Sequence, residues 1–364
     1  MGQISFARGI PAPELLPVEE LADCARAALE RDGRTILNYG PAGGYEPLRR
    51  WIGERHGVDP GRVVLTNGSL QGLAFLAARL VPRGRVLVET PTYDRPLKLL
   101  AQLGAEVTGI PLDDEGLDVD ALEAELRSGP QAAFLYTIPT FQNPSGRTLS
   151  TERRRRLVEL AQQHRLPIVE DDPYGLIRFE GESPPTLFEL AGGQGVVYGS
   201  SFSKTIAPGA RVGYLVLSDG LIEAVTAAAT ATYITPSLVA EATVFEFLRR
   251  GLLESNLERV RAGLRARRDA MLAALERELD GRGRWSRPAG GYFVWLELPE
   301  GVDARALLER AEAAGVTFVP GADFGGPPNS LRLAFSFVDP EAVDAGVGRL
   351  ASLVPTASSV QLAQ

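Results

Sequence analysis

Lysine is almost missing from this sequence. Of the 38 basic side chains, only Lys98 and Lys204 are lysines, and all the others are arginine. Arginine stays charged in proteins, so it cannot act as the neutral amine that Schiff-base chemistry requires. Any covalent amine chemistry must therefore use one of these two residues.

Cysteine and histidine are also scarce. Cys24 is the single cysteine, which excludes an internal disulfide and any metal site built from several cysteines. With only two histidines, His56 and His164, the chain has few side chains available for metal ligation or for Ser–His catalysis. We therefore expect no metal site.

Basic tracts and long apolar runs are missing too. The formal net charge of -8 argues against nucleic acid as the main partner. The one basic run, residues 153–156, begins a helical pattern and is better explained as a solvated helix face. No apolar run has membrane length, and no signal peptide is recognisable. We expect a cytoplasmic protein that binds neither nucleic acid nor membrane.

The apolar pattern of the first two thirds alternates short runs with helical stretches. This pattern predicts an α/β fold in which a mostly parallel sheet lies between helices. The last two runs are too close together for a helix between them, so the last strand could be antiparallel. The seven candidate strands are residues 63–66, 86–89, 106–110, 132–137, 168–171, 196–198 and 212–217.

A second, smaller α+β domain is expected near the C-terminus. With 364 residues the chain is long enough for two domains. Helical patterning runs from about residue 221 to 279 with a break at 234–236, and mixed strand and helix patterns follow it. The expected parts are an N-terminal arm and helix packing with the small domain (1–34), a large cofactor-binding domain (35–254), a small domain (255–354) and a flexible tail (355–364).

The segment 200–211 places Lys204 shortly after an apolar strand and among small hydroxyl residues. Parallel sheets present their ligand-binding groups at the carboxyl ends of the strands, which favours Lys204 as the nucleophile. Lys98 instead falls on the exposed side of an amphipathic helix pattern. On this segment alone, an ordinary surface lysine remains the alternative.

Other strand ends carry groups that would meet at the same edge of the sheet. Gly68 and Ser69 lie between a strand and a helix, where free N–H groups can hold a phosphate. Tyr93 follows the next strand and Asn143 follows the fourth. A plain turn, a core tyrosine and a simple Asn-Pro turn are the respective alternatives.

Glu170, Asp171 and Asp172 form a carboxylate cluster at the end of an apolar strand. Adjacent carboxylates repel one another unless one meets a positive partner, and a cationic ligand nitrogen would serve. Arg211 could supply a fixed charge to a phosphate, and Arg332 lies among apolar residues, which implies a carboxylate ligand. A phosphate cradle, an aromatic ring, a carboxylate, an amine and an arginine together match what pyridoxal 5'-phosphate needs.

From about residue 5 to 353, the chain resembles fold-type I pyridoxal-phosphate enzymes of the class I/II aminotransferase family. It is most similar to the 2-aminoadipate and kynurenine aminotransferase branch and to the effector domains of MocR-type regulators. The resemblance implies transfer of an amino group between an L-amino acid and a 2-oxo acid, with 2-oxoglutarate and glutamate as the expected pair. The motifs that carry it are Asn143-Pro144-Ser145-Gly146, Asp171 with Tyr174, Ser201 and Ser203 with Lys204, Arg211, Gly290-Gly291-Tyr292-Phe293-Val294-Trp295, and Arg332.

The resemblance also implies roles for individual residues. Lys204 would bind the cofactor covalently and then move the substrate proton. Asp171 would pair with the pyridine nitrogen, Asn143 and Tyr174 would contact the ring hydroxyl, and Tyr93 would stack on the ring. The phosphate would be held by Gly68, Ser69, the backbone of Leu70, Ser201, Ser203 and Arg211.

The same resemblance implies how substrate and partner bind. Arg332 would bind the substrate α-carboxylate, assisted by the backbone near Gly9. Tyr39 would reach the phosphate of a neighbouring subunit, which implies a homodimer with shared active sites.

Because of two departures from the family pattern, the resemblance does not identify the substrate. Relatives usually carry an extra N-terminal helix before the segment that starts here at Ile4, and Arg8 stands where glycine is common. Arg8 could bind a second carboxylate of the substrate, or it could point outward. Another pyridoxal-phosphate reaction (lyase, cyclase or oxidase) and a ligand-sensing domain without catalysis are the alternative functions.

Overall fold

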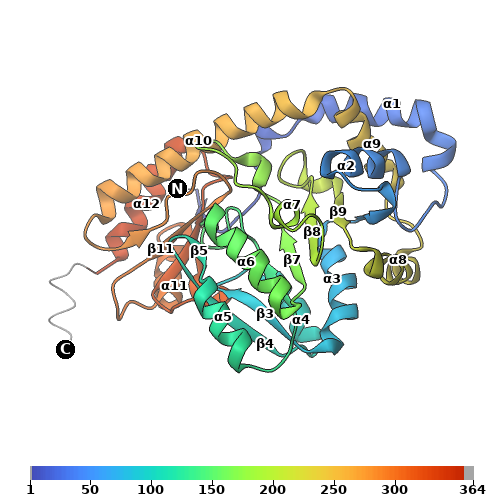
Figure 1. Cartoon of the computed structure of the whole chain (residues 1–364). Helices are drawn as coiled ribbons and strands as arrows, with labels where there is room; N and C mark the ends of the chain where they lie inside the picture. Colours follow the sequence, from blue (N-terminus) through green and yellow to red (C-terminus); the bar gives the residue numbers. More distant parts are fainter. Residues whose placement is uncertain (1, 356–364) are drawn as a thin grey trace.

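The computed structural model describes residues 2–355. These residues form a large sheet, a small sheet and a separate pair of short strands, surrounded by helices (Figure 1). Most of the predicted flexible tail, 355–364, lies outside the described residues. The order of strands in the large sheet is β2-β9-β8-β7-β6-β3-β4-β5. Its strands are β2 (Val63–Thr66), β3 (Arg85–Thr90), β4 (Val107–Asp113), β5 (Gly116–Leu117), β6 (Ala132–Thr137), β7 (Ile168–Asp171), β8 (Val196–Ser201) and β9 (Gly213–Val216).

The predicted α/β fold with a mostly parallel sheet is confirmed, with one strand more than expected. Strands β8, β7, β6, β3 and β4 run parallel, whereas β9 is antiparallel to both of its neighbours. The additional strand is β5, which pairs with the end of β4. Two residues are too few for a strand pattern to be recognised in the sequence.

Side chains alternate between the two faces of the large sheet, and each face belongs to a different core. In β7, Ile168 packs into one hydrophobic core and Val169 into the other. The same period of two puts Glu170 on the face of Ile168 and Asp171 on the face of Val169. The small sheet contributes to the core on the Val169 side.

Helices cover both faces of the large sheet and connect it to the small one. Thr151–His164 forms as predicted, with the Ser150 hydroxyl accepting from the N–H of Arg153. The helices are α1 (Val18–Ile36), α2 (Glu46–His56), α3 (Ser69–Leu80), α4 (Asp94–Gln102), α5 (Val119–Ser128), α6 (Thr151–His164), α7 (Leu187–Leu190), α8 (Asp219–Tyr233), α9 (Leu238–Arg249), α10 (Leu252–Leu279), α11 (Ala304–Ala313) and α12 (Pro340–Leu353).

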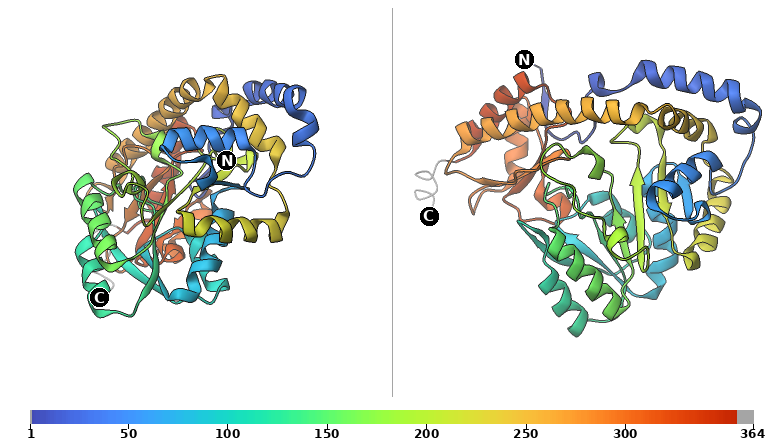
Figure 2. Two further views of the ribbon diagram at one scale, coloured as in Figure 1. Left: turned by 45° about the vertical axis from the view of Figure 1, so that its right-hand side comes forward. Right: turned by 45° about the horizontal axis from the view of Figure 1, so that its top comes forward.

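The long helix α10 runs along one side of the molecule from the large sheet to the small one (Figures 1 and 2). The expected break at 234–236 is confirmed, and a second break occurs at Gly251, which has a φ of 73°. We propose a domain boundary near residue 255, early in α10. The small sheet has the order β10-β11-β14-β13 and consists of β10 (Arg284–Trp285), β11 (Phe293–Glu297), β13 (Val319–Pro320) and β14 (Ser330–Ala334).

The N-terminal arm and the helix that follows it pack on different parts of the molecule. Strand β1 (Ile4–Ser5) pairs with β12 (Val316–Thr317) beside the small sheet, and Phe6 is fully buried there. Helix α1 instead packs on α9, so its expected place with the small domain is wrong. The reason is its apolar face, with Cys24 and Ala28 buried in the core of the large domain. None of the helices in residues 2–355 is long and apolar enough to cross a membrane.

Candidate active site

A cavity of about 420 Å³ lies at the carboxyl ends of the parallel strands, between the large sheet and the small one. The turn before α3, the segments after β7 and β8, and the N-terminal arm all reach it. All the predicted site residues except Arg8 and Tyr39 line it. They are Gly9, Gly68, Ser69, Leu70, Tyr93, Asn143, Asp171, Tyr174, Ser201, Ser203, Lys204, Arg211 and Arg332.

Lys204 follows β8, and its amine lies inside this cavity. Its Nζ donates a hydrogen bond of 2.8 Å to the carbonyl of Gly9 and lies 4.9 Å from the ring centroid of Tyr292. Burial lowers the pKa of the Lys204 amine to about 8, and repulsion from Arg332 and Arg211 adds to this effect. A neutral amine is therefore much easier to reach here than on an exposed lysine.

Asp171 ends β7 on the cavity side and has one carboxylate oxygen without a partner. Its Oδ2 accepts a 2.7 Å hydrogen bond from the hydroxyl of Tyr136, whereas its Oδ1 is buried and unpaired. Burial raises the pKa of Asp171 to about 6. A buried oxygen of this kind is costly unless a ligand donor meets it.

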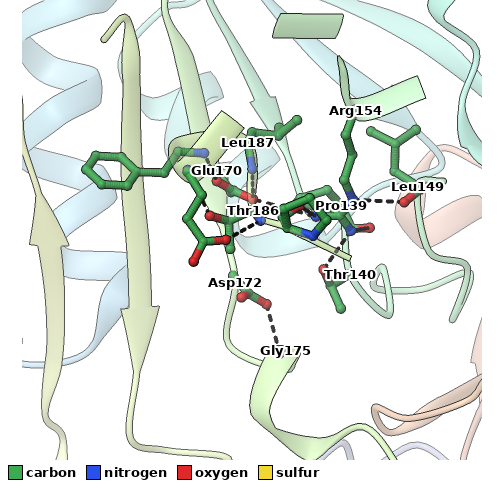
Figure 3. A network of polar contacts seen from close by, with 12 residues as sticks. Pro139, Thr140, Leu149, Arg154, Glu170, Asp172, Gly175, Thr186 and Leu187 are labelled. Carbon is green, nitrogen blue, oxygen red and sulfur yellow. Dashed lines mark hydrogen bonds and ion pairs between the residues drawn. The ribbon is translucent and has the colours of Figure 1, made fainter. Parts of the chain in front are cut away.

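The two other carboxylates of the cluster, Glu170 and Asp172, do not line the cavity. Both are satisfied by hydrogen bonds within the protein (Figure 3). Glu170 accepts from the N–H groups of Leu187 and Phe188 at 2.9 and 2.8 Å. Its Oε1 lies 3.9 Å from Nη1 of Arg154, which is fully buried. The positive partner of the cluster is thus an arginine of α6, and a ligand is needed only on the side of Asp171.

The turn before α3 forms a concave wall of donors. Gly68 has a φ of 94°, and a Cβ at this position would lie 2.1 Å from Nη2 of Arg211. Only glycine lets this guanidinium approach the backbone so closely. The first N–H groups of α3, at Ser69 and Leu70, have no partner within the helix. An arginine and free N–H groups at a helix start are the donors that an anion site requires.

Two serines complete the same wall from the segment after β8. The hydroxyl of Ser201 accepts from the N–H of Ser203 at 2.9 Å, and the two hydroxyl oxygens are 2.6 Å apart. The interaction fixes both hydroxyls beside Lys204. The predicted grouping of these residues with Arg211 is therefore seen in the cavity.

Arg332 lies in β14 on the opposite wall, with its guanidinium between aromatic rings. It lies 4.2 Å from the ring centroid of Phe293 and 4.8 Å from that of Phe324. Its Nη1 donates to Oδ1 of Asn143 at 2.9 Å, and its Nη2 donates to the carbonyl of Ala7 at 3.0 Å. No carboxylate of the described residues pairs with Arg332, so an anionic ligand would find a fixed and partly dry guanidinium here.

Arg8 and Tyr39 lie outside the cavity of their own chain. Arg8 is exposed, with its guanidinium 5.3 Å from the ring centroid of Phe337. The outward position that the sequence left open is the one observed. Tyr39 is 75% exposed and does not line this cavity.

Sequence reasoning missed three residues that shape the site. Tyr136 lies within an apolar strand, a pattern typical of a core residue. Its position near the carboxyl end of β6 does indicate that it could reach the site. Arg95, in the first turn of α4, lines the cavity. Its sequence pattern is that of an ordinary exposed residue on a helix. Glu89 accepts from Nε2 of Gln142 and from the N–H of Ile138, both at 3.1 Å, and thereby holds the loop that carries Asn143.

Comparison with known proteins assigns the family. Residues 4–350 match the family described as aminotransferase class I and II. The chain belongs to this family. The aminotransferase is 40% identical to the 2-aminoadipate transaminase of Thermus thermophilus, over 96% of this chain and 89% of that protein. It is 37% identical to aromatic-amino-acid aminotransferase 1 of Thermococcus litoralis, over 96% and 88% of the two chains.

A solved relative shows the same fold with a cofactor derivative bound. It is the alpha-aminoadipate aminotransferase of Thermus thermophilus, complexed with N-(5'-phosphopyridoxyl)-L-leucine. Its TM-score is 0.93 at 38% identity, covering 100% of this chain and 94% of that one. Enzymes of this family use pyridoxal 5'-phosphate, and the residues of the cavity fit it. The anion wall beside Gly68 suits its phosphate, and the unpaired Oδ1 of Asp171 suits its pyridinium N–H.

Proposed function

We propose that this aminotransferase acts on dicarboxylic substrates: it moves the amino group of 2-aminoadipate to 2-oxoglutarate and, in the reverse direction, the amino group of glutamate to a 2-oxo acid. The observation that carries the proposal is the amine of Lys204 in one cavity with the unpaired oxygen of Asp171 and the guanidinium of Arg332. An amine, an unmatched carboxylate and an unmatched cation are the groups that this reaction requires at one place.

The cofactor supplies an electrophilic carbonyl and an electron sink when bound. Lys204 is the proposed catalytic residue, because its Nζ can attack as a neutral amine and later move the proton of the substrate Cα. Asp171 holds the proton of the ring nitrogen, since its carboxylate charge favours the protonated ring. Asn143 and Tyr174 would orient the ring at its hydroxyl, and Tyr93 would pack against its face, since all three residues line the cavity.

The phosphate is proposed to bind at the anion wall. Its donors are the N–H groups at the start of α3, two serine hydroxyls and one guanidinium, which together supply fixed dipoles and one charge. These groups would orient the cofactor in the cavity that also contains the amine of Lys204. The set consists of Gly68, Ser69, Leu70, Ser201, Ser203 and Arg211.

The substrate carboxylates are proposed to bind at two arginines. Arg332 binds the α-carboxylate, near the backbone of Gly9, because it is buried and has no carboxylate partner among the described residues. Arg95 binds the second carboxylate. It is exposed at the cavity. Its contact with Asp94 is long, at 3.8 Å, and Lys98 pairs with the same carboxylate at 2.6 Å.

A panel of amino donors tests this assignment, with product identities read by mass spectrometry. The amino acceptor is 2-oxoglutarate for every donor except glutamate, which is paired with 2-oxoadipate so that new products form. Arg95→Gln is expected to lower kcat/KM for glutamate and 2-aminoadipate by about tenfold or more, and for leucine and phenylalanine far less. Arg8→Gln is the matched control, since it removes an exposed arginine that lies outside the cavity. Equal losses for all donors in Arg95→Gln would contradict the dicarboxylic assignment, and absence of any oxo-acid product would contradict transamination.

We also propose a homodimer in which Tyr39 completes the phosphate site of the other subunit. Leu37, Tyr39 and Ile234 are 71%, 75% and 53% exposed in the single chain, and contact with a second subunit would remove such apolar surface from water. Sedimentation should give a two-chain mass. Mixing Lys204→Ala with Tyr39→Ala subunits should restore some activity, because each mixed dimer then keeps one intact site. A one-chain mass would contradict the proposal.

A further inference from the structure

A second cavity, of about 330 Å³, lies where the large and small sheets meet, and it shares no lining residue with the candidate active site. One wall comes from the segment around Gly146 and Arg147 and from Arg178, all on the side of the large sheet. The other wall comes from β10, the residues after it, and Trp295 of β11. Its size falls at the lower end of ordinary ligand sites.

The lining of this second cavity is basic in a chain whose net charge is -8. Four arginines face two carboxylates, those of Asp114 and Glu297. Arg147 already uses both carboxylates, at 2.8 and 4.0 Å. The remaining arginines are Arg178, Arg284 and Arg287.

Two of these arginines have no carboxylate partner among residues 2–355. Arg287 pairs with Glu276, outside the cavity, whereas neither Arg178 nor Arg284 takes part in an ion pair. Arg284 is exposed at the rim and, within the described residues, makes no hydrogen bond through its side chain. Its charge is therefore available to a ligand that enters from solvent.

Arg178 repeats the arrangement of Arg332 on the other side of the loop that carries Asn143. Its guanidinium lies 4.6 Å from the ring centroid of Phe141, and its one hydrogen bond within the described chain is a 3.2 Å contact to the carbonyl of Glu180. Its Nε is buried and unpaired, as is Nε1 of Trp285 in the same lining. A partly buried guanidinium without a counter-charge is unfavourable unless an anion meets it.

We propose that this second cavity is a binding site for a small polyanion, a metabolite that carries a phosphate or several carboxylates. Arg178 holds the anion from the large sheet and Arg284 from the small one, so the ligand bridges the two parts of the molecule. The active site lies within reach of this bridge. Gly146 is three residues from Asn143, and Trp295 is paired with Arg332 across β11 and β14.

The test uses holoenzyme in which borohydride has fixed the cofactor, so that the phosphate wall of the active site stays filled. Inorganic phosphate and tricarballylate are titrated separately at constant ionic strength, by calorimetry and by tryptophan fluorescence. Two of the three tryptophans of the chain line the cavity, so binding should change the emission. We expect saturable binding with a Kd at or below about 1 mM for at least one probe. The tighter probe identifies phosphate or carboxylate as the recognised group.

Variants place the binding at this cavity. Arg284→Gln should weaken the Kd by about tenfold, and it should fold normally because its side chain is exposed and unpaired. Arg178→Gln should weaken it at least as much. Arg83→Gln is the control for net charge, since this exposed arginine lines neither cavity. In Arg332→Gln, the Kd for both probes should equal that of the unmodified protein.

Three outcomes would overturn the proposal. The first is no saturable binding of either probe below about 10 mM. The second is an equal loss in Arg83→Gln and Arg284→Gln, which would indicate general charge screening. The third is a loss in Arg332→Gln with Arg284→Gln unaffected, because the probes would then bind at the active site.

Discussion

The two faces of strand β7 show how differently one sequence motif can be used. On one face, Asp171 leaves an oxygen unpaired in the cavity beside Lys204. On the other, Glu170 and Asp172 are met by backbone N–H groups and a buried arginine (Figure 3). Asp172 also accepts from the hydroxyl of Tyr198. All three carboxyls have a raised pKa for the same first reason, which is burial. A shifted pKa therefore does not separate the two faces, whereas the unpaired oxygen does.

The comparison predicts that substitutions on the cavity face act on catalysis and those on the opposite face act on stability. The largest effect is expected for Lys204→Ala, which removes the nucleophile and the proton carrier together. Turnover should fall by about 10³-fold or more while the thermal midpoint stays close to that of the unmodified protein. Steady-state rates and circular dichroism measure the two effects. In the unmodified holoenzyme, borohydride should fix the cofactor mass at Lys204, and peptide mapping that finds it at Lys98 would refute the assignment.

Asp171→Asn is expected to keep the fold and lower turnover by about tenfold to a hundredfold, because the amide lacks the charge that holds the ring proton. Asp172→Asn is the matched control from the other face. It should leave turnover of the folded enzyme nearly unchanged. It should reduce the free energy of unfolding by about 1–3 kcal/mol, because it weakens the hydrogen bonds that Asp172 accepts from the Tyr198 hydroxyl and the Gly175 N–H. An active Asp171→Asn beside an inactive Asp172→Asn would show that the two faces have been assigned the wrong way round.

Arg154→Met should act on stability alone. Removing one partner of a buried charge pair costs about 3–5 kcal/mol, because the remaining charge is left without a counter-charge. Urea unfolding measures this loss, and kcat of the folded fraction should not change. The double variant Arg154→Met/Glu170→Gln should lose less than the sum of the single variants, since the orphaned charge is removed as well. Additive losses would mean that the two side chains do not interact, despite the 3.9 Å separation.

The sequence predicted the cavity face better than the opposite face, and the reason is physical. Lys204, Asp171 and Asn143 all follow apolar strands, and parallel strands bring their carboxyl ends to one edge. Local pattern is therefore enough to group them. Arg154 belongs to α6, and its partners come from segments around Leu149, Pro139 and Pro185. Such a contact depends on tertiary packing, which no local pattern encodes.

The misplaced helix α1 has the same origin. Its amphipathic pattern predicted a helix, but a pattern does not say which apolar surface the helix will cover. Helix α1 packs on α9 because Cys24 and Ala28 are buried there and Arg31 forms an ion pair with Glu246. These two segments are far apart in sequence. The sequence also left open whether Arg8 points into the cavity or outward, because local pattern does not fix the direction of a side chain on an irregular arm. The arm does reach the cavity at Gly9, but the side chain before it packs on Phe337.

The pH dependence of cofactor capture is expected to report Lys204 directly. Its amine must be neutral to attack, and its pKa is lowered to about 8. Below this pH the neutral fraction falls tenfold per pH unit, so the rate of cofactor capture by apoenzyme should rise with pH and level off above about 8. Stopped-flow absorbance between pH 6 and about 10 measures it. A rise that continues to the usual pKa of lysine would mean that the amine is not desolvated in the apoenzyme.

The smallest effect is expected for Lys98→Met. This variant tests whether Lys98, as one of only two lysines in the chain, takes part in catalysis. Lys98 is 63% exposed and pairs with Asp94 one helical turn away. Exposed pairs with this spacing contribute about 0.3–0.5 kcal/mol, and salt screens them. Turnover and cofactor content should therefore stay the same, and the loss of stability should disappear at high salt. One exception is foreseen, because the change frees Asp94 to pair with Arg95. If Arg95 binds the second carboxylate, then Lys98→Met should raise KM for glutamate slightly and leave KM for leucine unchanged.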